Sequence, residues 1–156
     1  STPYGGFYVL GGLYRKGYTR TAEMYMKKYW SPMILRHNDT AWENFGDGSD
    51  GSGQGTLSHA WSGGPTYHMT AHVLGVDLGF PDFPPVDSLV LRPQAASIQW
   101  ARGSVPYGDD VIHVDWRVEG EKLHYDCKVP QGLEWTVVPA GPLAEKELWV
   151  NGEKRN

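Results

Sequence analysis

The spacing of apolar residues changes along the chain, and this change limits the folds open to it. Up to about Val76 apolar residues recur at helical spacing, whereas beyond Pro85 they alternate with polar ones. Side chains on one helical face recur every three to four residues, while strand side chains alternate between faces. We therefore predict an α+β chain in two parts, residues 1–80 with helices and loops and residues 81–156 with an antiparallel β-sandwich.

Three helices are predicted in the first part, each with its own boundary signals. Lys16-Gly17 end the first, because a basic last turn followed by glycine suits a helix C-terminus. Thr19 is a suitable N-cap for the second and Pro32 bounds it, since proline disfavours the helical conformation of the residue before it. The helices are expected near residues 7–14, 20–29 and 65–74.

Turn signals in the second part recur about every 8 to 12 residues, as in antiparallel sandwiches. Ile112–Val118 alternates apolar and polar residues, so one face should be buried and the other wet. Val118–Lys122 contains Gly120 and is typical of a hairpin turn. The expected strands are 88–91, 97–101, 111–118, 122–129, 134–138 and 147–150.

Composition narrows the classes of partner. The net charge is −4 and no basic stripe occurs, which argues against nucleic acid and anionic membrane surfaces. No apolar run approaches the roughly 20 residues that span a membrane. Cys127 is the single cysteine, which excludes an internal disulfide framework and a multi-thiolate metal site. Its strand-like flanks indicate a buried structural thiol, and no cofactor is expected.

A long glycine-rich loop interrupts the helical part. Residues 42–64 contain seven glycines, and loops of this length inside a compact domain are usually functional or disordered. Asp47–Asp50 resembles part of a calcium loop, but Ser58 stands where an EF-hand needs a bidentate glutamate. A flexible loop is therefore favoured over a calcium site, and no other metal site is predicted.

Two short stretches carry candidate chemistry. Thr40-Ala41-Trp42-Glu43-Asn44-Phe45 places a carboxylate between aromatic rings, which lower the local dielectric and suit an acid or base. Thr56–Ser62 contains His59 and Trp61, which are able to hydrogen-bond to a sugar and stack on it. On spacing alone, each stretch also fits a surface acid beside a packed ring, or a capping histidine.

Taken together and in this order, the two stretches resemble the end of the catalytic barrel of α-L-rhamnosidases. The resemblance continues through segments similar to that family's passage into its C-terminal β-sandwich and to its closing strands, and it covers nearly the whole chain. The segments that carry it are Thr40-Ala41-Trp42-Glu43, Ser58-His59-Ala60-Trp61, the helix from Pro65, Val73-Leu74-Gly75-Val76, Leu91-Arg92-Pro93, Trp100–Pro106, Val129-Pro130 and Val138-Pro139.

The resemblance implies an inverting six-hairpin glycoside hydrolase that removes terminal α-L-rhamnose, with an (α/α)6 catalytic barrel. Glu43 matches the general base of that family and His59 a histidine that contacts the sugar. Trp42 and Trp61 are expected to be pocket walls. The family's general acid lies upstream, so this chain needs the remainder of the barrel as a partner, and the isolated chain is expected to be inactive.

Two other readings of the function stay open. The first is a related six-hairpin glycosidase that cleaves another sugar. The second is a non-catalytic carbohydrate-binding or structural module, in which the β-sandwich is the functional part. The sequence shows no exposed aromatic row typical of a lectin, so a sandwich that supports the barrel is the simpler reading of residues 82–156.

Overall fold

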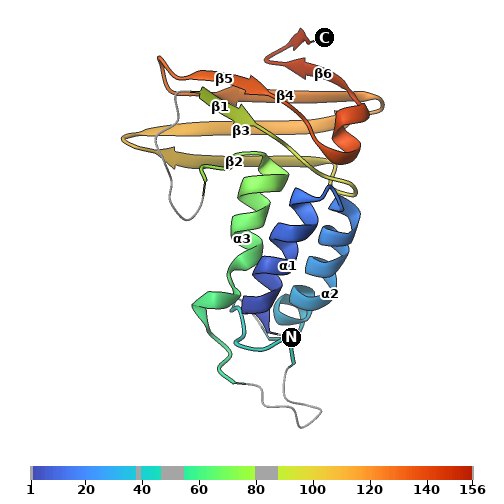
Figure 1. Cartoon of the computed structure of the whole chain (residues 1–156), viewed down its shortest axis with the longest axis vertical. Coiled ribbons are helices and arrows are strands. Elements are labelled where there is room, and N and C mark those ends of the chain that lie inside the picture. The colour runs from blue at the N-terminus through green and yellow to red at the C-terminus, as the bar shows by residue number, and fades with distance from the viewer. Residues whose placement is uncertain (1, 38–39, 47–54, 80–87, 156) are drawn as a thin grey trace. The chain divides into compact units, whose positions relative to one another are not determined.

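The computed structural model describes residues 2–37, 40–46, 55–79 and 88–155, with helices in the first half and strands in the second (Figure 1). The α+β class is therefore confirmed. The chain divides into two compact units, Ser1–His68 and Met69–Asn156. The predicted division between residues 80 and 81, and the assignment of the helices to an (α/α)6 barrel, remain predictions.

The first unit begins with α1 (Pro3–Arg15). The side-chain oxygen of Thr2 accepts a hydrogen bond from the Gly5 N–H at 3.3 Å, which satisfies one free donor of the first turn. Gly17 has a φ of +76°, a conformation that glycine adopts without steric cost. The end predicted from Lys16-Gly17 is thus confirmed.

Helix α2 runs from Thr19 to His37 and continues through Pro32, so its predicted end near Tyr29 was wrong. An interior proline costs a helix about 3 kcal/mol. Trp30 and Met33, which flank Pro32, are 7% and 2% exposed. Burying one large apolar side chain stabilises by roughly 1.5–3 kcal/mol, so burial on both sides outweighs the proline.

The core of the first unit forms where α1 and α2 approach closely. A Cβ added at Gly6 would lie 2.6 Å from the ring of Trp30, so only glycine allows this approach. The Trp30 indole N–H donates to the carbonyl oxygen of Ser62 at 2.8 Å, which ties α2 to the short 3-10 helix η1 (Ala60–Ser62). The last helix of the unit is α3 (Gly64–His68).

The second unit opens with a π-helical turn, η2 (Met69–Leu74). The sequence predicts one α-helix over 65–74, so the helical character is confirmed but the change to π geometry at Met69 was not anticipated. Gly75 ends the turn with a φ of +90°, and a side chain there would collide with the backbone of Pro93. The stop predicted at Gly75 therefore has a second cause, a close backbone approach.

Two sheets make up the rest of the second unit. One contains five strands in the order β2-β3-β4-β6-β7, and the other pairs β1 with β5. A 3-10 helix, η3 (Gly141–Glu145), precedes β6. The strands are β1 (Ser88–Leu91), β2 (Trp100–Tyr107), β3 (Asp110–Glu119), β4 (Lys122–Lys128), β5 (Glu134–Val137), β6 (Glu147–Val150) and β7 (Glu153–Lys154).

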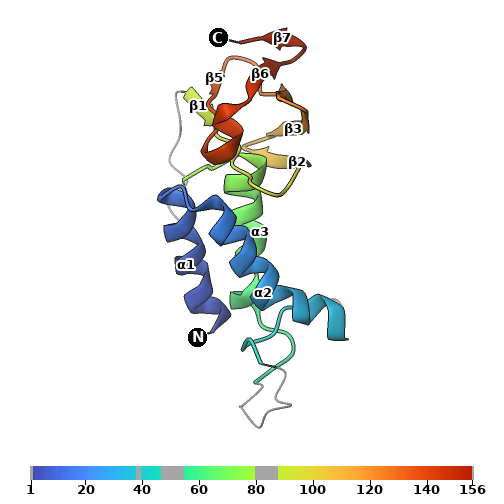
Figure 2. The same cartoon turned by 90° about the vertical axis from the view of Figure 1, so that its right-hand side faces the viewer.

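The pairing is mostly antiparallel, but two pairs are parallel, which corrects the expected purely antiparallel sandwich. Strand β1 pairs with β5 in parallel, and so does β4 with β6. The connection from β4 to β6 passes through β5 and η3, which provides the long crossover that parallel strands need. The two views in Figures 1 and 2 place the β1–β5 pair over one face of the larger sheet.

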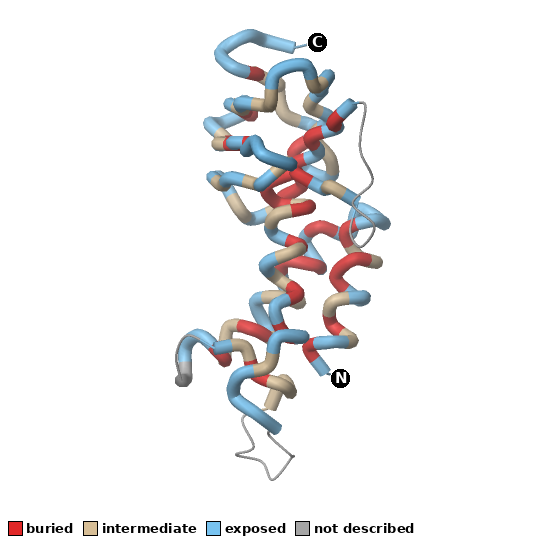
Figure 3. The backbone as a smooth tube through the Cα atoms, turned by 90° about the vertical axis from the view of Figure 1, so that its left-hand side faces the viewer, coloured by how far each residue is buried: buried red, intermediate tan, exposed pale blue. Residues whose placement is uncertain are grey.

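Side chains that alternate between the two faces of the strands form the core of the second unit. Buried and exposed positions alternate along β3 and β4, as expected from the sequence (Figure 3). The indole N–H of Trp116 donates to the Val73 carbonyl at 2.9 Å, and the Tyr125 hydroxyl donates to the Leu74 carbonyl at 3.1 Å. Both rings are fully buried, so these bonds attach η2 to the inner face of the sheet.

Among the described residues, no helix is both long enough and apolar enough to cross a membrane.

Candidate functional site

Glu43 lies after α2 and is fixed against the segment that begins at Gly55. Its backbone N–H donates to the Thr56 carbonyl at 2.9 Å, and the Thr56 N–H donates to the Glu43 carboxylate oxygen Oε2 at 2.8 Å. The bonds are reciprocal, so backbone geometry sets the position of the carboxylate. Among the described residues, no partner binds the second oxygen, Oε1, which leaves it available to accept a proton.

Gly55 makes this arrangement possible. Its φ is +63°, and a Cβ there would lie 2.5 Å from Oε2 of Glu43. Real Cβ atoms do not approach other atoms so closely, and L side chains rarely adopt this φ. The sequence shows Gly55 only as one of seven glycines, so its role beside the carboxylate was missed. The signal that could have revealed this role is the position of the glycine, directly before Thr56, whose N–H binds the Glu43 carboxylate.

His59 and Trp61 form a pair beside Glu43. Their rings stack with centroids 4.0 Å apart and planes 26° apart, and the Trp61 backbone N–H donates to Nδ1 of His59 at 3.4 Å. The Trp61 indole N–H donates to the backbone carbonyl of Glu43 at 3.0 Å. The structure therefore brings together three of the four site residues predicted from the sequence.

Trp42, the fourth predicted residue, lies in the core of the first unit and is fully buried. Its backbone N–H donates to the Met33 sulfur at 3.4 Å, and its carbonyl accepts a short hydrogen bond from the Ser62 hydroxyl. The indole Nε1 has no hydrogen-bond partner among the described residues. Trp42 thus supports the backbone next to Glu43, and its predicted role as a pocket wall stays a prediction.

Two tyrosines of α1 extend the aromatic surface near Trp61. The Tyr4 ring lies 5.7 Å from the Trp61 ring, and the hydroxyls of Tyr4 and Tyr8 are 3.0 Å apart. This hydrogen bond, more than charge or burial, raises the pKa of the Tyr8 hydroxyl. Tyr4 and Tyr8 are 50% and 57% exposed. Neither tyrosine was predicted as a site residue from the sequence, although their i, i+4 spacing places them on one helical face.

Histidines and carboxylates elsewhere do not form a metal centre within the described residues, where no group of three or more potential ligands gathers. His68 is buried, and its Nε2 lies 2.8 Å from the Phe7 carbonyl oxygen. The Asp47–Asp50 segment, considered above for calcium, lies outside the described residues.

Part of the second unit matches a known protein family. Residues 82–152 match the family model of the bacterial alpha-L-rhamnosidase C-terminal domain. This part of the chain is therefore similar to a rhamnosidase C-terminal domain. No curated protein matches the chain. The match agrees with the resemblance drawn from the sequence and supports a glycoside hydrolase context, and residues 1–81, which include Glu43, lie outside it.

The matched range, residues 82–152, contains the strands from β1 to β6 together with η3. Cys127 lies in β4, within the matched range, and is partly buried. The pKa of its thiol is raised to about 11, chiefly by burial and to a smaller extent by the charge of Asp126, while the hydrogen bond with Asn151 acts in the opposite direction. A thiol that holds its proton at neutral pH is a poor nucleophile, which agrees with the structural role expected from the sequence.

Proposed function

We propose that this chain is the C-terminal part of an inverting glycoside hydrolase that removes terminal α-L-rhamnose. The match of residues 82–152 to the rhamnosidase C-terminal domain carries the proposal. In this assignment residues 1–80 are the end of the catalytic (α/α)6 barrel, and residues 81–156 are the C-terminal domain. The substrate is a rhamnose-containing glycoside.

Glu43 is the general base of the proposed reaction. Inverting glycosidases use two carboxyl groups about 6.5–9.5 Å apart, one to protonate the leaving oxygen and one to activate water on the opposite face of the sugar. The Thr56 N–H holds Oε2 of Glu43, and Oε1 is available to accept the proton of the attacking water.

His59, Trp61 and Trp42 support the base in distinct ways. His59 and Trp61 are substrate-contacting groups, since the imidazole is able to hydrogen-bond to hydroxyls and the indole ring to pack against the apolar face of the sugar. Trp61 also donates to the Glu43 carbonyl, so it couples the sugar-contacting surface to the base. Trp42 anchors this backbone in the core, where its side chain is fully buried.

The remainder of the barrel is the proposed partner of the first unit. Large apolar side chains of α2 are exposed, among them Met24 at 64%, Ile34 at 74% and Leu35 at 81%. Exposed apolar surface of this kind marks sites that another segment covers. The upstream helices would cover it and supply the general acid, so residues 1–156 alone should not hydrolyse glycosides.

The test uses a longer protein that contains this chain and the residues upstream of Ser1. It should release rhamnose from an aryl α-L-rhamnoside, and proton NMR should show the β-anomer of rhamnose as the first product, because inversion changes the anomeric configuration. Residues 1–156 alone should release none. Hydrolysis of a different aryl glycoside would assign another sugar specificity, and α-rhamnose as the first product would refute inversion.

A further inference from the structure

The outer face of the five-stranded sheet carries polar side chains in register. Ile112, Val114 and Trp116 of β3 point into the core, so the residues between them point outward. Strand pairing aligns these with outward residues of β2 and β4. The resulting rows are Trp100–Arg117–His124, Arg102–Asp115–Asp126 and Ser104–His113–Lys128.

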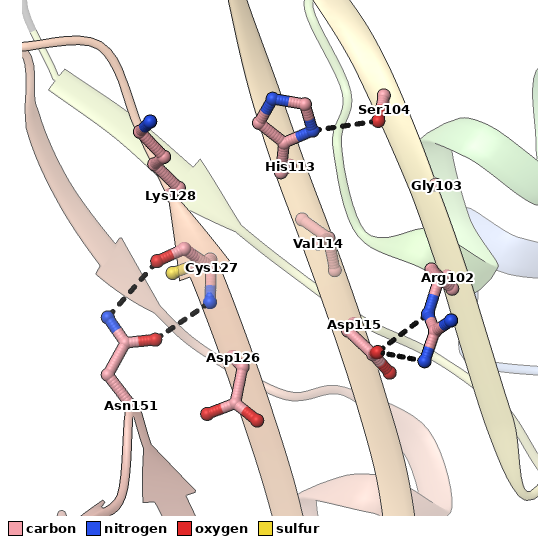
Figure 4. A pocket seen from close by; sticks show the side chains of 10 residues that line it. All are labelled: Arg102, Gly103, Ser104, His113, Val114, Asp115, Asp126, Cys127, Lys128 and Asn151. Carbon is pink, nitrogen blue, oxygen red and sulfur yellow. Dashed lines mark hydrogen bonds and ion pairs between the residues drawn. The ribbon is translucent and has the colours of Figure 1, made fainter.

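An open groove of about 410 Å³ runs over the second and third rows, between β2, β3 and β4 (Figure 4). This volume falls within the roughly 300–1,000 Å³ of small-molecule sites. Arg102 holds Asp115 through its Nε and Nη2 atoms, each 2.7 Å from the same carboxylate oxygen, Oδ2. Within the described part of the chain, the other oxygen of Asp115, Oδ1, has no partner and faces a possible ligand.

The second carboxylate of the groove is also available. Asp126 faces Asp115 across β3 and β4, and like charges directly opposite each other are unfavourable in a sheet. Among the described residues, it forms an ion pair with Arg117, whose Nη1 lies 3.9 Å from Oδ2, beyond the length of a hydrogen bond. Ligand hydroxyl groups would stabilise this pair, because each donates a charge-assisted hydrogen bond to a carboxylate.

The charges of the groove balance. Arg102 and Lys128 carry positive charges, and Asp115 and Asp126 carry negative ones. The groove therefore favours neither an anion nor a cation. Both donors and acceptors line it, including the Ser104 hydroxyl, which lies 2.8 Å from Nδ1 of His113. A neutral ligand with many hydroxyl groups fits this arrangement best.

Trp100 supplies an apolar surface beside the groove. It lies two residues before Arg102 on the same face of β2, and it is 67% exposed. Its exposed ring therefore offers a flat aromatic surface beside the groove. A pyranose ring has a polar rim and a flat face of C–H groups, and an aromatic ring packs against such a face.

We propose that this groove, together with Trp100, binds a neutral oligosaccharide. One sugar ring packs on Trp100, and the hydroxyls of the next bind Asp115, Asp126 and Arg102. The groove shares no residue with the proposed catalytic site, so the proposal does not depend on Glu43. Its function would be to hold the domain on a glycan chain, independently of cleavage.

The test is an NMR titration of the whole 156-residue chain. The probes are methyl α-L-rhamnoside, rutinose, maltotriose and mannotriose as neutral sugars, and a heparin tetrasaccharide as an anionic one. At least one neutral oligosaccharide should produce saturable shifts at the Trp100 indole and at the backbone of β2–β4. Trp100→Ala and Asp115→Asn should each weaken that binding about tenfold, a change of 1.4 kcal/mol.

Two controls separate this proposal from the others. Trp135→Ala removes another exposed tryptophan, on β5 outside the groove, and should leave the affinity unchanged. Glu43→Gln should also leave it unchanged, so failure of the proposed function would not affect this result. The inference is overturned if no neutral probe shifts the groove residues, if only the heparin fragment binds, or if binding survives both groove substitutions in folded protein.

Discussion

Glu43 and Thr56 are joined by two reciprocal hydrogen bonds, N–H to carbonyl at 2.9 Å and N–H to carboxylate at 2.8 Å. The pair connects the segment after α2 to the segment that carries His59 and Trp61. Because the donor to the carboxylate is a backbone group, substituting a neighbouring side chain leaves the donor in place. The position of the acid is therefore sensitive to backbone changes around Thr56.

Gly55→Ala tests this sensitivity. The added methyl group would lie 2.5 Å from Oε2 of Glu43, so the carboxylate must move. In the full-length enzyme kcat should fall by roughly 10²-fold, because displacement of a catalytic group by about 1 Å has an effect of this size. The measurement is steady-state hydrolysis of an aryl α-L-rhamnoside.

Gly17→Ala is the matched control. Gly17 has a φ of +76°, similar to the +63° of Gly55, but a Cβ there meets no atom within 4 Å. Both substitutions carry the same backbone strain, of order 1–2 kcal/mol, and only one displaces the carboxylate. Equal losses of kcat in the two variants would show that strain alone is responsible, and the proposed contact would be wrong.

Trp116→Phe should destabilise the second unit by about 2 kcal/mol or more. It removes the indole N–H that donates to the Val73 carbonyl, and it leaves space in a fully buried site. Trp100→Phe, at a position 67% exposed, should change the free energy of unfolding by less than about 0.5 kcal/mol. Urea unfolding followed by circular dichroism compares the two, and similar losses would contradict the packing described.

Cys127 should react slowly with iodoacetamide in the folded chain. Burial raises its pKa from the ordinary 9.0 to about 11, so at pH 8 the thiolate fraction, and with it the rate, falls roughly 100-fold. The chain in guanidinium chloride is the reference, and it has no other cysteine. Equal rates in the two states would refute the shift.

The raised pKa of Cys127 also determines whether the free energy of unfolding rises or falls with pH. The folded thiol keeps its proton to a higher pH than the unfolded thiol, so the folded state binds more protons between pH 9 and 11. The contribution of the Cys127 thiol to the free energy of unfolding is fully present below pH 9 and is lost as the pH rises through 11. Cys127→Ser should therefore flatten the fall in stability over this window.

The isolated chain should self-associate through the exposed end of α2. Ile34 and Leu35 are 74% and 81% exposed, and burying them between two copies is favourable. Ile34→Glu with Leu35→Glu should shift sedimentation velocity profiles toward the monomer. Arg20→Gln with Lys27→Gln lowers the net charge by the same amount at exposed positions. This control variant should leave the sedimentation profile unchanged. An equal shift in both variants would assign the effect to charge.

The sequence predicted the boundary of a helix or hairpin correctly where the conformational preference of a nearby residue determines that boundary. The end of α1 at Lys16-Gly17 and the hairpin around Gly120 are confirmed, because a glycine with positive φ is required at each position. The end of α2 was mispredicted, because tertiary burial of Met33 outweighs the proline signal. Strand β2 begins at Trp100 and reaches Tyr107, beyond the predicted 97–101, and its Pro106 is tolerated because β2 is an edge strand.

Strand pairing, and contacts between residues that are distant in the sequence, were harder to predict from the sequence. Alternation predicts strands but not their partners, so the parallel β4–β6 and β1–β5 pairs were not foreseen. Glu43, His59 and Trp61 were identified through the family resemblance, and the structure places them together. Gly55 was missed because its role depends on a contact with Glu43, twelve residues earlier, that no periodicity reveals.

The turnover of Glu43→Gln in the full-length enzyme tests the central claim most directly. A general base contributes about 10²–10⁴-fold, so kcat for an aryl α-L-rhamnoside should fall by that factor, with KM and folding little changed. Glu121→Gln, the same change at a side chain 88% exposed, should keep normal activity. Normal turnover by Glu43→Gln would contradict the assignment of Glu43 as the base.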